Sequence, residues 1–201
     1  EISLPMTKYA VATYYILMPA EVSTNLGRLD GLRYWHVSNK WYTSMDEFYE
    51  NNRWEGFWDE TQRRIILWSY VLSAWFYDAY YKKAWQIRTL IMQDFQKAFS
   101  EVDVIVSPAS PDVAWKLGEK IDDPIKMYLS DAYTIPASLA WLPWICVPAW
   151  FAKSNDEEKE NLPVWLQILA KQFDDQKVLE VAHVFEQATW YWKINPKWFE
   201  D

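Results

Sequence analysis

Apolar residues in this sequence follow two spacings, one typical of strands and one typical of helices. A continuous apolar run at 10–18, rich in β-branched and aromatic residues, ends before Pro19 and predicts a buried strand. A short apolar run at 102–107 predicts a central strand, and runs at 144–147 and 164–169 predict two more strands.

Apolar positions three or four residues apart predict helices elsewhere. The longest such segment, 59–99, is expected to form two helices or one bent helix, with its weak point near 73–75. Shorter helices are predicted at 19–26, with Pro19 in the first turn, and at 45–53, 123–129, 131–139 and 174–189. In the last helix, six residues are expected on the apolar side: Val178, Leu179, Val181, Ala182, Val184 and Phe185.

Polar segments complete this pattern. Loops are expected at 27–40 and 109–123, a charged hairpin-like excursion at 153–161, and a polar tail after 189. Ser44 lies three residues before Glu47, which matches a capping box at the start of a helix. Because helices separate the strands and neither a repeat nor a linker is visible, we expect an α/β architecture in one domain.

Composition and charge narrow the functional classes. A formal net charge of -8 and a pI near 4.9 argue against a domain dominated by phosphate contacts. The single cysteine, Cys146, excludes an internal disulfide framework and a four-cysteine zinc site, and two histidines leave little for a histidine-based metal site. No apolar run is long enough for a membrane span, and no secretory leader follows Glu1. The missing initiator methionine indicates a fragment.

The counts of glycine and tryptophan do not fit an ordinary globular chain. The sequence has Gly 4 and Trp 15, although average usage predicts roughly 14 glycines in a chain of this length. Trp141, Trp144 and Trp150 lie around two prolines, where turns favour small residues. We favour the hypothesis that UGA codons meant for glycine were translated as tryptophan. A truly tryptophan-rich binding surface and an engineered chain are the alternatives.

The residues alone reveal no self-evident active site. There is no Gly-rich phosphate loop, HExxH or GxSxG motif, and the candidate nucleophiles Ser107, Ser110 and Ser130 have no assigned histidine partner. His36 in a loop is uninformative, and a structural or partly exposed role is expected for His183. The remaining expectations are an inert buried thiol for Cys146, a solvated pair for Arg63–Arg64 and a helix N-cap for Asp131.

Nine strings, in order along nearly the whole chain, carry a resemblance to a known family. They are AEVSTNLGRLDGLRY at 20–34, QRRIIL at 62–67, YDAYYKK at 77–83, RTLI at 88–91, VIVSP at 104–108, DDP at 122–124, MYLSD at 127–131, LPVWLQ at 162–167 and VAHVFEQA at 181–188. Together they resemble the C-terminal part of the amidase signature family, and within it the A subunits of tRNA-dependent amidotransferases. The resemblance implies a single amidase domain, of which 1–201 would be the C-terminal portion, with a mixed β-sheet flanked by helices.

The resemblance also implies a two-step activity. The A subunits hydrolyse glutamine through a Ser–cis-Ser–Lys triad, and the ammonia amidates Glu-tRNA(Gln) or Asp-tRNA(Asn) on the B subunits. The family's lysine and serine signature lies in its N-terminal half and is not in this chain, so the chain should not be catalytic by itself. The implied partners are the B and C subunits, misacylated tRNA and glutamine, without a membrane, in the cytoplasm. ATP and Mg²⁺ would be used by the whole complex and not bound by this chain.

What the chain retains resembles the glutamine-recognition side of the family. Arg64 matches the arginine that pairs with the substrate α-carboxylate, and Asp131 matches the carboxylate that takes the α-ammonium. Tyr15, or its neighbour Tyr14, is a weaker match to a tyrosine that lines the pocket. The family pattern has glycine at eight tryptophans of this chain: Trp35, Trp58, Trp68, Trp75, Trp141, Trp144, Trp150 and Trp165.

Two other functions stay open. A general amidase of the same family would act on simple amides without a tRNA partner, and it would not need Arg64 and Asp131 to bind a free amino acid. A noncatalytic tryptophan-rich module, for example one that binds glycans, would need its tryptophans to be real and exposed in rows.

Overall fold

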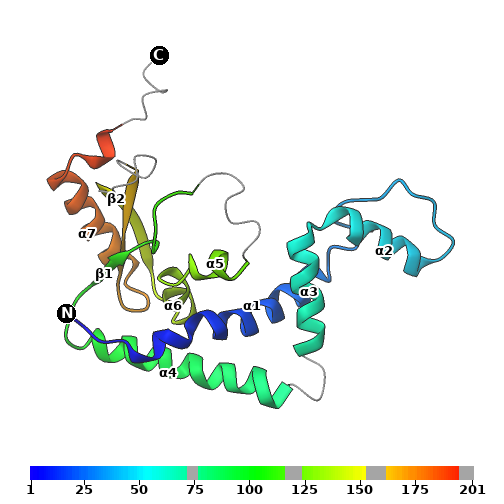
Figure 1. The fold of residues 1–201 in the computed structure, drawn as a ribbon, viewed down its shortest axis with the longest axis horizontal. Coiled ribbons are helices and arrows are strands. Elements are labelled where there is room, and N and C mark those ends of the chain that lie inside the picture. The colour runs from blue at the N-terminus through cyan, green and yellow to red at the C-terminus, as the bar shows by residue number, and fades with distance from the viewer. Residues whose placement is uncertain (72–76, 116–123, 153–161, 195–201) are drawn as a thin grey trace. The chain divides into compact units, whose positions relative to one another are not determined.

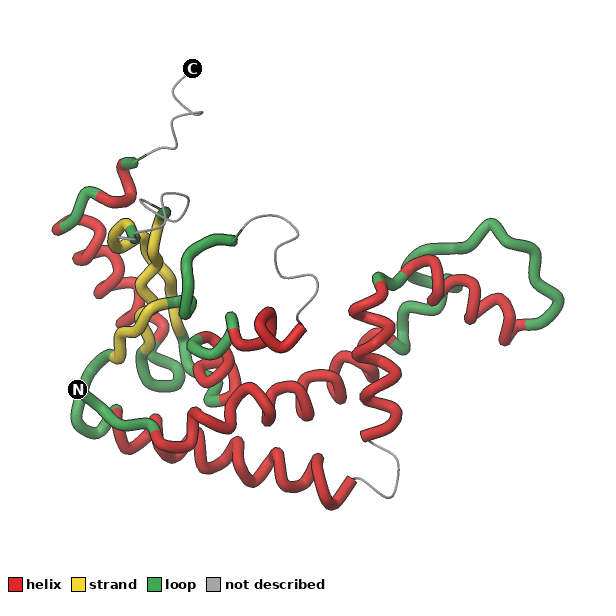
Figure 2. The backbone as a smooth tube through the Cα atoms, viewed as in Figure 1, coloured by secondary structure: helices red, strands yellow, loops and turns green. Residues whose placement is uncertain are grey.

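The computed structural model describes residues 1–71, 77–115, 124–152 and 162–194 (Figures 1 and 2). The chain falls into two compact units. One unit comprises 12–86, and the other comprises 1–11 together with 87–201. Two helices continue from one unit into the other: α1 (Ala10–Leu26) and α4 (Lys83–Ala98).

A three-stranded antiparallel sheet forms the centre of the second of these units. Its strands β1 (Ile105–Pro108), β2 (Trp144–Phe151) and β3 (Pro163–Leu169) are arranged in the order β1-β3-β2. Ile168 in β3 lies opposite Val106 in β1 and opposite Ile145 in β2. Because β3 pairs on both sides, it fixes the register of the other two strands.

Helix α7 (Asp175–Ala188) packs on this sheet and completes the core (Figure 1). The period of the helix places Val178 and Ala182 on the same face, where both are buried against the strands. The buried core cluster consists of Val147, Ile168, Ala170, Val178 and Ala182.

The remaining elements of the sheet-containing unit are short. They are η1 (Pro5–Tyr9), α5 (Pro124–Leu129), α6 (Thr134–Leu139) and η3 (Tyr191–Lys193). The described residues of the other unit are all helix or loop. This unit contains most of α1 together with α2 (Met45–Gly56), α3 (Asp59–Val71) and the π-helical turn η2 (Tyr77–Lys82). In the described ranges, no helix is both long and apolar enough to cross a membrane.

The predicted α/β class is confirmed, but the strand predicted at 10–18 is wrong. These residues and 19–26 form one helix, α1, with Pro19 inside it and not in its first turn. Ala10, Thr13, Leu17 and Ala20 are buried at helical spacing. A short apolar run does not distinguish a strand from a buried helix, and its β-branched and aromatic content favoured the wrong choice.

The strand predicted at 102–107 is present as β1, but its predicted central position is wrong. Among the described strands, β1 covers only Ile105–Pro108 and lies at one edge, while β3 occupies the centre. An apolar run indicates that both faces of a strand are buried, but it does not indicate which strands lie next to it in the sheet. The strands predicted at 144–147 and 164–169 are confirmed, and β2 continues to Phe151.

The helix predictions are largely confirmed. The segment 59–99 contains α3, the turn η2 and α4. The weak point predicted near 73–75 lies outside the described residues, and so do the predictions at 116–123, at 153–161 and from 195 onwards. Helices at 45–53, 123–129 and 174–189 appear as α2, α5 and α7, whereas the helix predicted from 131 begins only at Thr134. Leu179 and Val184, expected on the apolar side of α7, are exposed.

The capping box predicted at Ser44 forms only in part. The Ser44 hydroxyl accepts a hydrogen bond from the Glu47 amide, as an N-cap should. The Glu47 carboxylate, however, accepts from the amide and hydroxyl of Thr43, one residue earlier than the motif requires. The carboxylate therefore fixes the entry into α2 through Thr43, and these bonds lower the pKa of Glu47.

Substitution of Ser44 tests this cap. Ser44→Ala should lower the free energy of unfolding by about 1 kcal/mol, because the Glu47 amide loses its acceptor. Ser44→Asp should retain the stability, because Asp caps as well as Ser does. Urea unfolding of the chain measures both, and an equal loss for the two variants would show that the side chain at 44 has another role.

Candidate functional site

Arg64 lies on α3 and lines a cavity of about 390 Å³ in the helical unit. Its neighbours come from α1, from the loop before α2, from the end of α2 and the turn after it, and from the first turn of α3. They are Val22, Leu26, Trp35, Gly56, Phe57, Trp58, Glu60 and Thr61. Most of the lining residues are apolar, so the guanidinium of Arg64 is one of the few polar groups that a ligand in this cavity could contact.

The guanidinium of Arg64 is half-buried and held on two sides. Its Nε donates to Glu60 Oε1 at 2.9 Å, one helical turn earlier, and its Cζ lies 5.8 Å from the ring centroid of Tyr15. Burial acts to lower the pKa of Arg64, but the Glu60 hydrogen bond and charge outweigh it and raise the pKa. A guanidinium also carries donors on both Nη atoms, so it can bind a carboxylate ligand without releasing Glu60.

Sequence reasoning placed Arg64 and Tyr15 in one site, and both lie in the helical unit within this cation–π distance. Tyr14 stacks edge-on against Tyr15 with ring centroids 5.2 Å apart. Arg63, expected to be solvated with Arg64, is exposed but also pairs with Glu60. The two arginines thus share one carboxylate, and only Arg64 lines the cavity.

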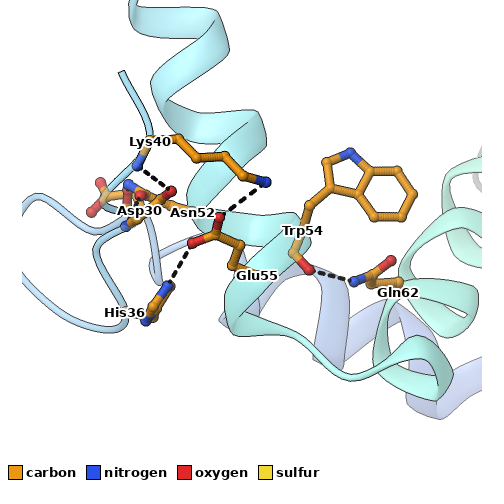
Figure 3. Close-up of polar contacts among 8 residues, drawn as sticks. Asp30, His36, Lys40, Asn52, Trp54, Glu55 and Gln62 are labelled. Atoms are coloured by element: carbon orange, nitrogen blue, oxygen red, sulfur yellow. Dashed lines mark hydrogen bonds and ion pairs between the residues drawn. The ribbon is translucent and has the colours of Figure 1, made fainter. Parts of the chain in front are cut away.

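The loop that carries Trp35 into this cavity is anchored to α2 (Figure 3). The fully buried Asn52 accepts from the Ser38 amide at 2.7 Å and donates to the Asp30 carbonyl at 3.1 Å. One turn further on, Glu55 pairs with His36 Nε2 at 3.1 Å and with Lys40 Nζ at 3.0 Å. Two residues of one helix therefore hold both halves of the loop.

Sequence reasoning missed this anchor. The signal available was Asn52 on the same helical face as the buried Phe48, four residues earlier, since a buried amide needs several hydrogen-bond partners. Gly31, with φ of 81°, packs against Asn52, and a side chain at that position would collide with the amide. The loop therefore depends on a glycine and an asparagine that no catalytic motif contains.

Asp131 lies in the sheet-containing unit and lines a separate cavity of about 420 Å³. The N-cap expected for it is wrong. The residue that caps α6 is Tyr133, and the backbone carbonyl of Asp131 accepts from the amides of Thr134 and Ile135. The Asp131 residue is exposed, and its carboxylate is not needed for the helix.

The walls of the Asp131 cavity contain two of the three serines considered as nucleophiles, together with Cys146. Ser110, Ser130 and Cys146 line it with Thr134, and among its described lining residues there is no histidine. Burial raises the pKa of the Cys146 thiol, which keeps it protonated and favours the inert role predicted for it, although it is only half-buried. Ser107 instead donates to Gln167 Oε1 at 3.2 Å in β3.

The histidines and possible metal ligands add no catalytic group. His183 is exposed on α7, as expected, and His36 is part of the loop anchor. Within the described ranges, no group of three His, Cys, Asp or Glu side chains could hold a metal ion.

In the described residues, two of the eight tryptophans for which the resemblance implies a family glycine adopt a left-handed backbone. Trp35 has φ of 90° and Trp141 has φ of 54°, and Phe173 is the other described non-glycine residue with positive φ, at 66°. L-residues with a side chain adopt this region rarely because Cβ approaches the following carbonyl oxygen. Six of the eight are exposed by more than a third: Trp35, Trp58, Trp141, Trp144, Trp150 and Trp165.

Glu55 gives the loop anchor a pH dependence. Hydrogen bonds from His36 and Lys40 lower the pKa of Glu55 from 4.5 to about 2. Because the folded pKa lies below the unfolded one, the anchor stabilises the loop fully above about pH 4.5, and this contribution is lost as the pH falls toward 2.

We therefore expect Glu55→Gln to weaken the loop at neutral pH and to remove this pH dependence. Amide exchange of 36–40 and ¹³C NMR titration of the Glu55 carboxyl measure the two effects. Glu50→Gln on the same helix is the matched control, because no partner contacts Glu50 in the described residues. A Glu55 carboxyl that titrates at 4.5 in the folded chain would contradict the anchor.

Comparisons with known proteins place the chain in a family. The family model described as Amidase matches residues 1–179. The A subunit of glutamyl-tRNA(Gln) amidotransferase from Sulfurihydrogenibium sp. (strain YO3AOP1) is 49% identical over 197 residues, which are 98% of this chain and 39% of that protein. The protein of the same name from Bacillus cytotoxicus is 51% identical over 191 residues, covering 95% of this chain and 38% of that protein.

Solved structures agree with this placement. A crystal structure of the A subunit of glutamyl-tRNA(Gln) amidotransferase from Thermotoga maritima matches with a TM-score of 0.62 and 38% identity, over 94% of this chain and 34% of that one. A crystal structure of an amidase, 22% identical, shares the fold with a TM-score of 0.66 over 94% of this chain and 37% of that one. The chain spans about 39% of the length of the curated relatives it matches. Because the family match runs through most of its sequence, the chain belongs to the amidase family.

Proposed function

We propose that this chain is the C-terminal, glutamine-recognising portion of the A subunit of a tRNA-dependent amidotransferase. The whole protein would hydrolyse glutamine, and the ammonia would amidate Glu-tRNA(Gln) or Asp-tRNA(Asn). The observation that carries this proposal is the identity of 49% and 51%, over 98% and 95% of the chain, to proteins named as A subunits of glutamyl-tRNA(Gln) amidotransferase. A general amidase has less support, since the amidase crystal structure that shares the fold is only 22% identical.

In this proposal Arg64 binds the α-carboxylate of glutamine. Its position in a cavity of about 390 Å³ with mostly apolar walls supports the role, because a charge–charge contact is stronger beside apolar surroundings than in bulk water. Glu60 holds Nε and so orients the guanidinium for a contact through Nη1 and Nη2. Tyr15, on the face of the guanidinium, would form a wall of this site.

Asp131 takes the α-ammonium of glutamine in the same proposal. Its backbone carbonyl is committed to α6, whereas its carboxylate is exposed at a cavity of about 420 Å³. A carboxylate with water access can exchange bound solvent for an ammonium group. Recognition of both charged ends of an amino acid would select free glutamine over simple amides.

The remaining chemistry would come from outside this chain. The Ser–cis-Ser–Lys triad would lie in the part of the relatives' length that this chain does not span, and the B and C subunits would complete the complex with misacylated tRNA. ATP and Mg²⁺ would act at the amidation step. The proposed location is the cytoplasm.

Arg64→Ala in the intact amidotransferase tests the proposed function. The KM for glutamine should rise about 10- to 150-fold, the loss expected for a charged hydrogen bond, and the KM for ammonia should rise far less. Arg63→Ala is the matched control, because Arg63 shares Glu60 but does not line the cavity. Equal losses with glutamine and ammonia as donors would contradict the role of Arg64.

We also propose that the natural protein has glycine at the eight tryptophans named above, through UGA codons read as tryptophan. Three backbone positions support this. Trp35 and Trp141 have left-handed φ, and the Trp58 carbonyl accepts the Gln62 amide, which makes Trp58 the N-cap of α3. Glycine is favoured at all three kinds of position, and tryptophan at none.

Trp141 occupies the most specific of these positions. Helix α6 ends with the Trp141 amide bonded to the Ser138 carbonyl and the Leu142 amide bonded to the Ala137 carbonyl. This pair of bonds is a Schellman motif, in which the left-handed residue is usually glycine. Phe173 shows that an aromatic residue can adopt the same φ, so the support lies in the combination of φ and motif.

Trp58→Gly tests the codon proposal in the folded chain. The free energy of unfolding should rise by about 0.5–1 kcal/mol, because glycine is the better N-cap and the Trp58 side chain, 85% exposed, contributes little packing. Trp85→Gly, inside α4, is the control and should lower it by at least about 1 kcal/mol. A loss of stability in Trp58→Gly, or UGG codons in the gene at the eight positions, would contradict the proposal.

A further inference from the structure

An arginine occupies the buried face of helix α4. Arg88, Ile91, Phe95 and Ala98 recur on α4 at helical spacing, and all four are buried. Arg88 is only 5% exposed. A buried guanidinium carries a desolvation cost that an apolar side chain of similar length would avoid, so its partners must account for it.

Arg88 contacts the end of α6. Its Nε donates to the Leu139 carbonyl at 2.8 Å, and Leu139 is the last residue of that helix. A carbonyl in the last turn of a helix has no partner within the helix, and a cation near it is favourable. Gln172 donates to the next carbonyl, that of Ala140, at 2.9 Å. Side chains from α4 and from the turn before α7 therefore fix the end of α6.

The other end of α6 carries the residues of the Asp131 cavity. Ser130, Asp131 and Thr134 all line it. The Asp131 carbonyl is bonded to the first amides of the helix, and Ile135, Ala137 and Leu139 are buried below it. A helix of six residues held this way moves as one body, so a shift at Leu139 is transmitted to Asp131.

We infer that Arg88 is a positioning residue for substrate recognition: through the Leu139 carbonyl it holds α6 so that Asp131 stays in place for the ammonium group of glutamine. This inference rests on the proposed function of Asp131. In this inference Arg88 acts through α6: besides the bond to the Leu139 carbonyl, its guanidinium lies over the Trp141 ring, with Cζ 3.8 Å from the ring centroid.

Hydrogen exchange on the full chain tests the structural step. Arg88→Met should speed amide exchange at Thr134 and Ile135 more than in the β2–β3 pairing, and Arg88→Lys, which keeps a buried donor, should restore part of the protection. Lys97→Met, which removes an exposed cation from the same helix, is the control and should change neither. Equal acceleration in α6 and in the sheet would overturn the inference, since it would show a general loss of stability.

A double-mutant cycle in the intact amidotransferase tests the functional step. Arg88→Met should raise the KM for glutamine about 10- to 100-fold, the effect of a misplacement of about 1 Å, and should raise the KM for ammonia much less. Combined with Asp131→Asn, it should add little further, because both changes remove the same contact. Arg88→Lys is measured beside it, and partial recovery of the glutamine KM is expected.

The possible outcomes separate the two proposals. Additive effects of Arg88→Met and Asp131→Asn would overturn the positioning role while leaving Asp131 as the ammonium site. No effect of Asp131→Asn alone would instead refute the proposed function of Asp131. If Arg88→Met does not fold, Arg88→Gln takes its place, and a raised glutamine KM without faster exchange at Thr134 and Ile135 would overturn the inference.

Discussion

Backbone N–H and C=O groups at the ends of short helices and loops need hydrogen-bond partners. Residues in or near the two candidate cavities take part in these hydrogen bonds. Ser44 caps α2 through its side chain, and Asp131 holds the start of α6 through its backbone carbonyl, which leaves its carboxylate to solvent. Arg88 satisfies a carbonyl at the end of α6, and Asn52 satisfies two groups of the loop that leads to Trp35. The buried side chains of Arg88 and Asn52 thus hold short segments through their backbone groups, in addition to the apolar contacts of those segments.

The same backbone requirements give the tryptophans their significance. An indole can be accommodated on the surface, and most of these are exposed, so side-chain packing alone does not exclude tryptophan. The left-handed φ at Trp35 and Trp141 is a property of the main chain, which glycine adopts without steric cost. Trp35 and Trp58 also line the Arg64 cavity, so the identity of these residues decides how much room a substrate carboxylate would have.

Sequence patterns predicted much of the fold because most of its elements have a clear period or a clear cap. Helix α7 and strand β3 follow from apolar spacing, and the start of α2 follows from Ser44. The run at 10–18 forms a helix and not the predicted strand, because a short apolar run contains little information that separates the two. The run at 102–107 contains a strand that is not central, because an apolar run contains no information on strand pairing. For the site, resemblance supplied Arg64 and Asp131, while Arg88 and Asn52 act through contacts between distant segments that no local pattern contains.

The central proposal is that the intact protein recognises free glutamine by its charged ends, through Arg64 and Asp131 of this chain. A crystal structure of the intact amidotransferase with glutamine bound tests this claim most directly. The account predicts the α-carboxylate within hydrogen-bond distance of Arg64 Nη atoms and the α-ammonium within hydrogen-bond distance of the Asp131 carboxylate. Glutamine bound in the glutaminase site of the complex with neither contact would contradict it.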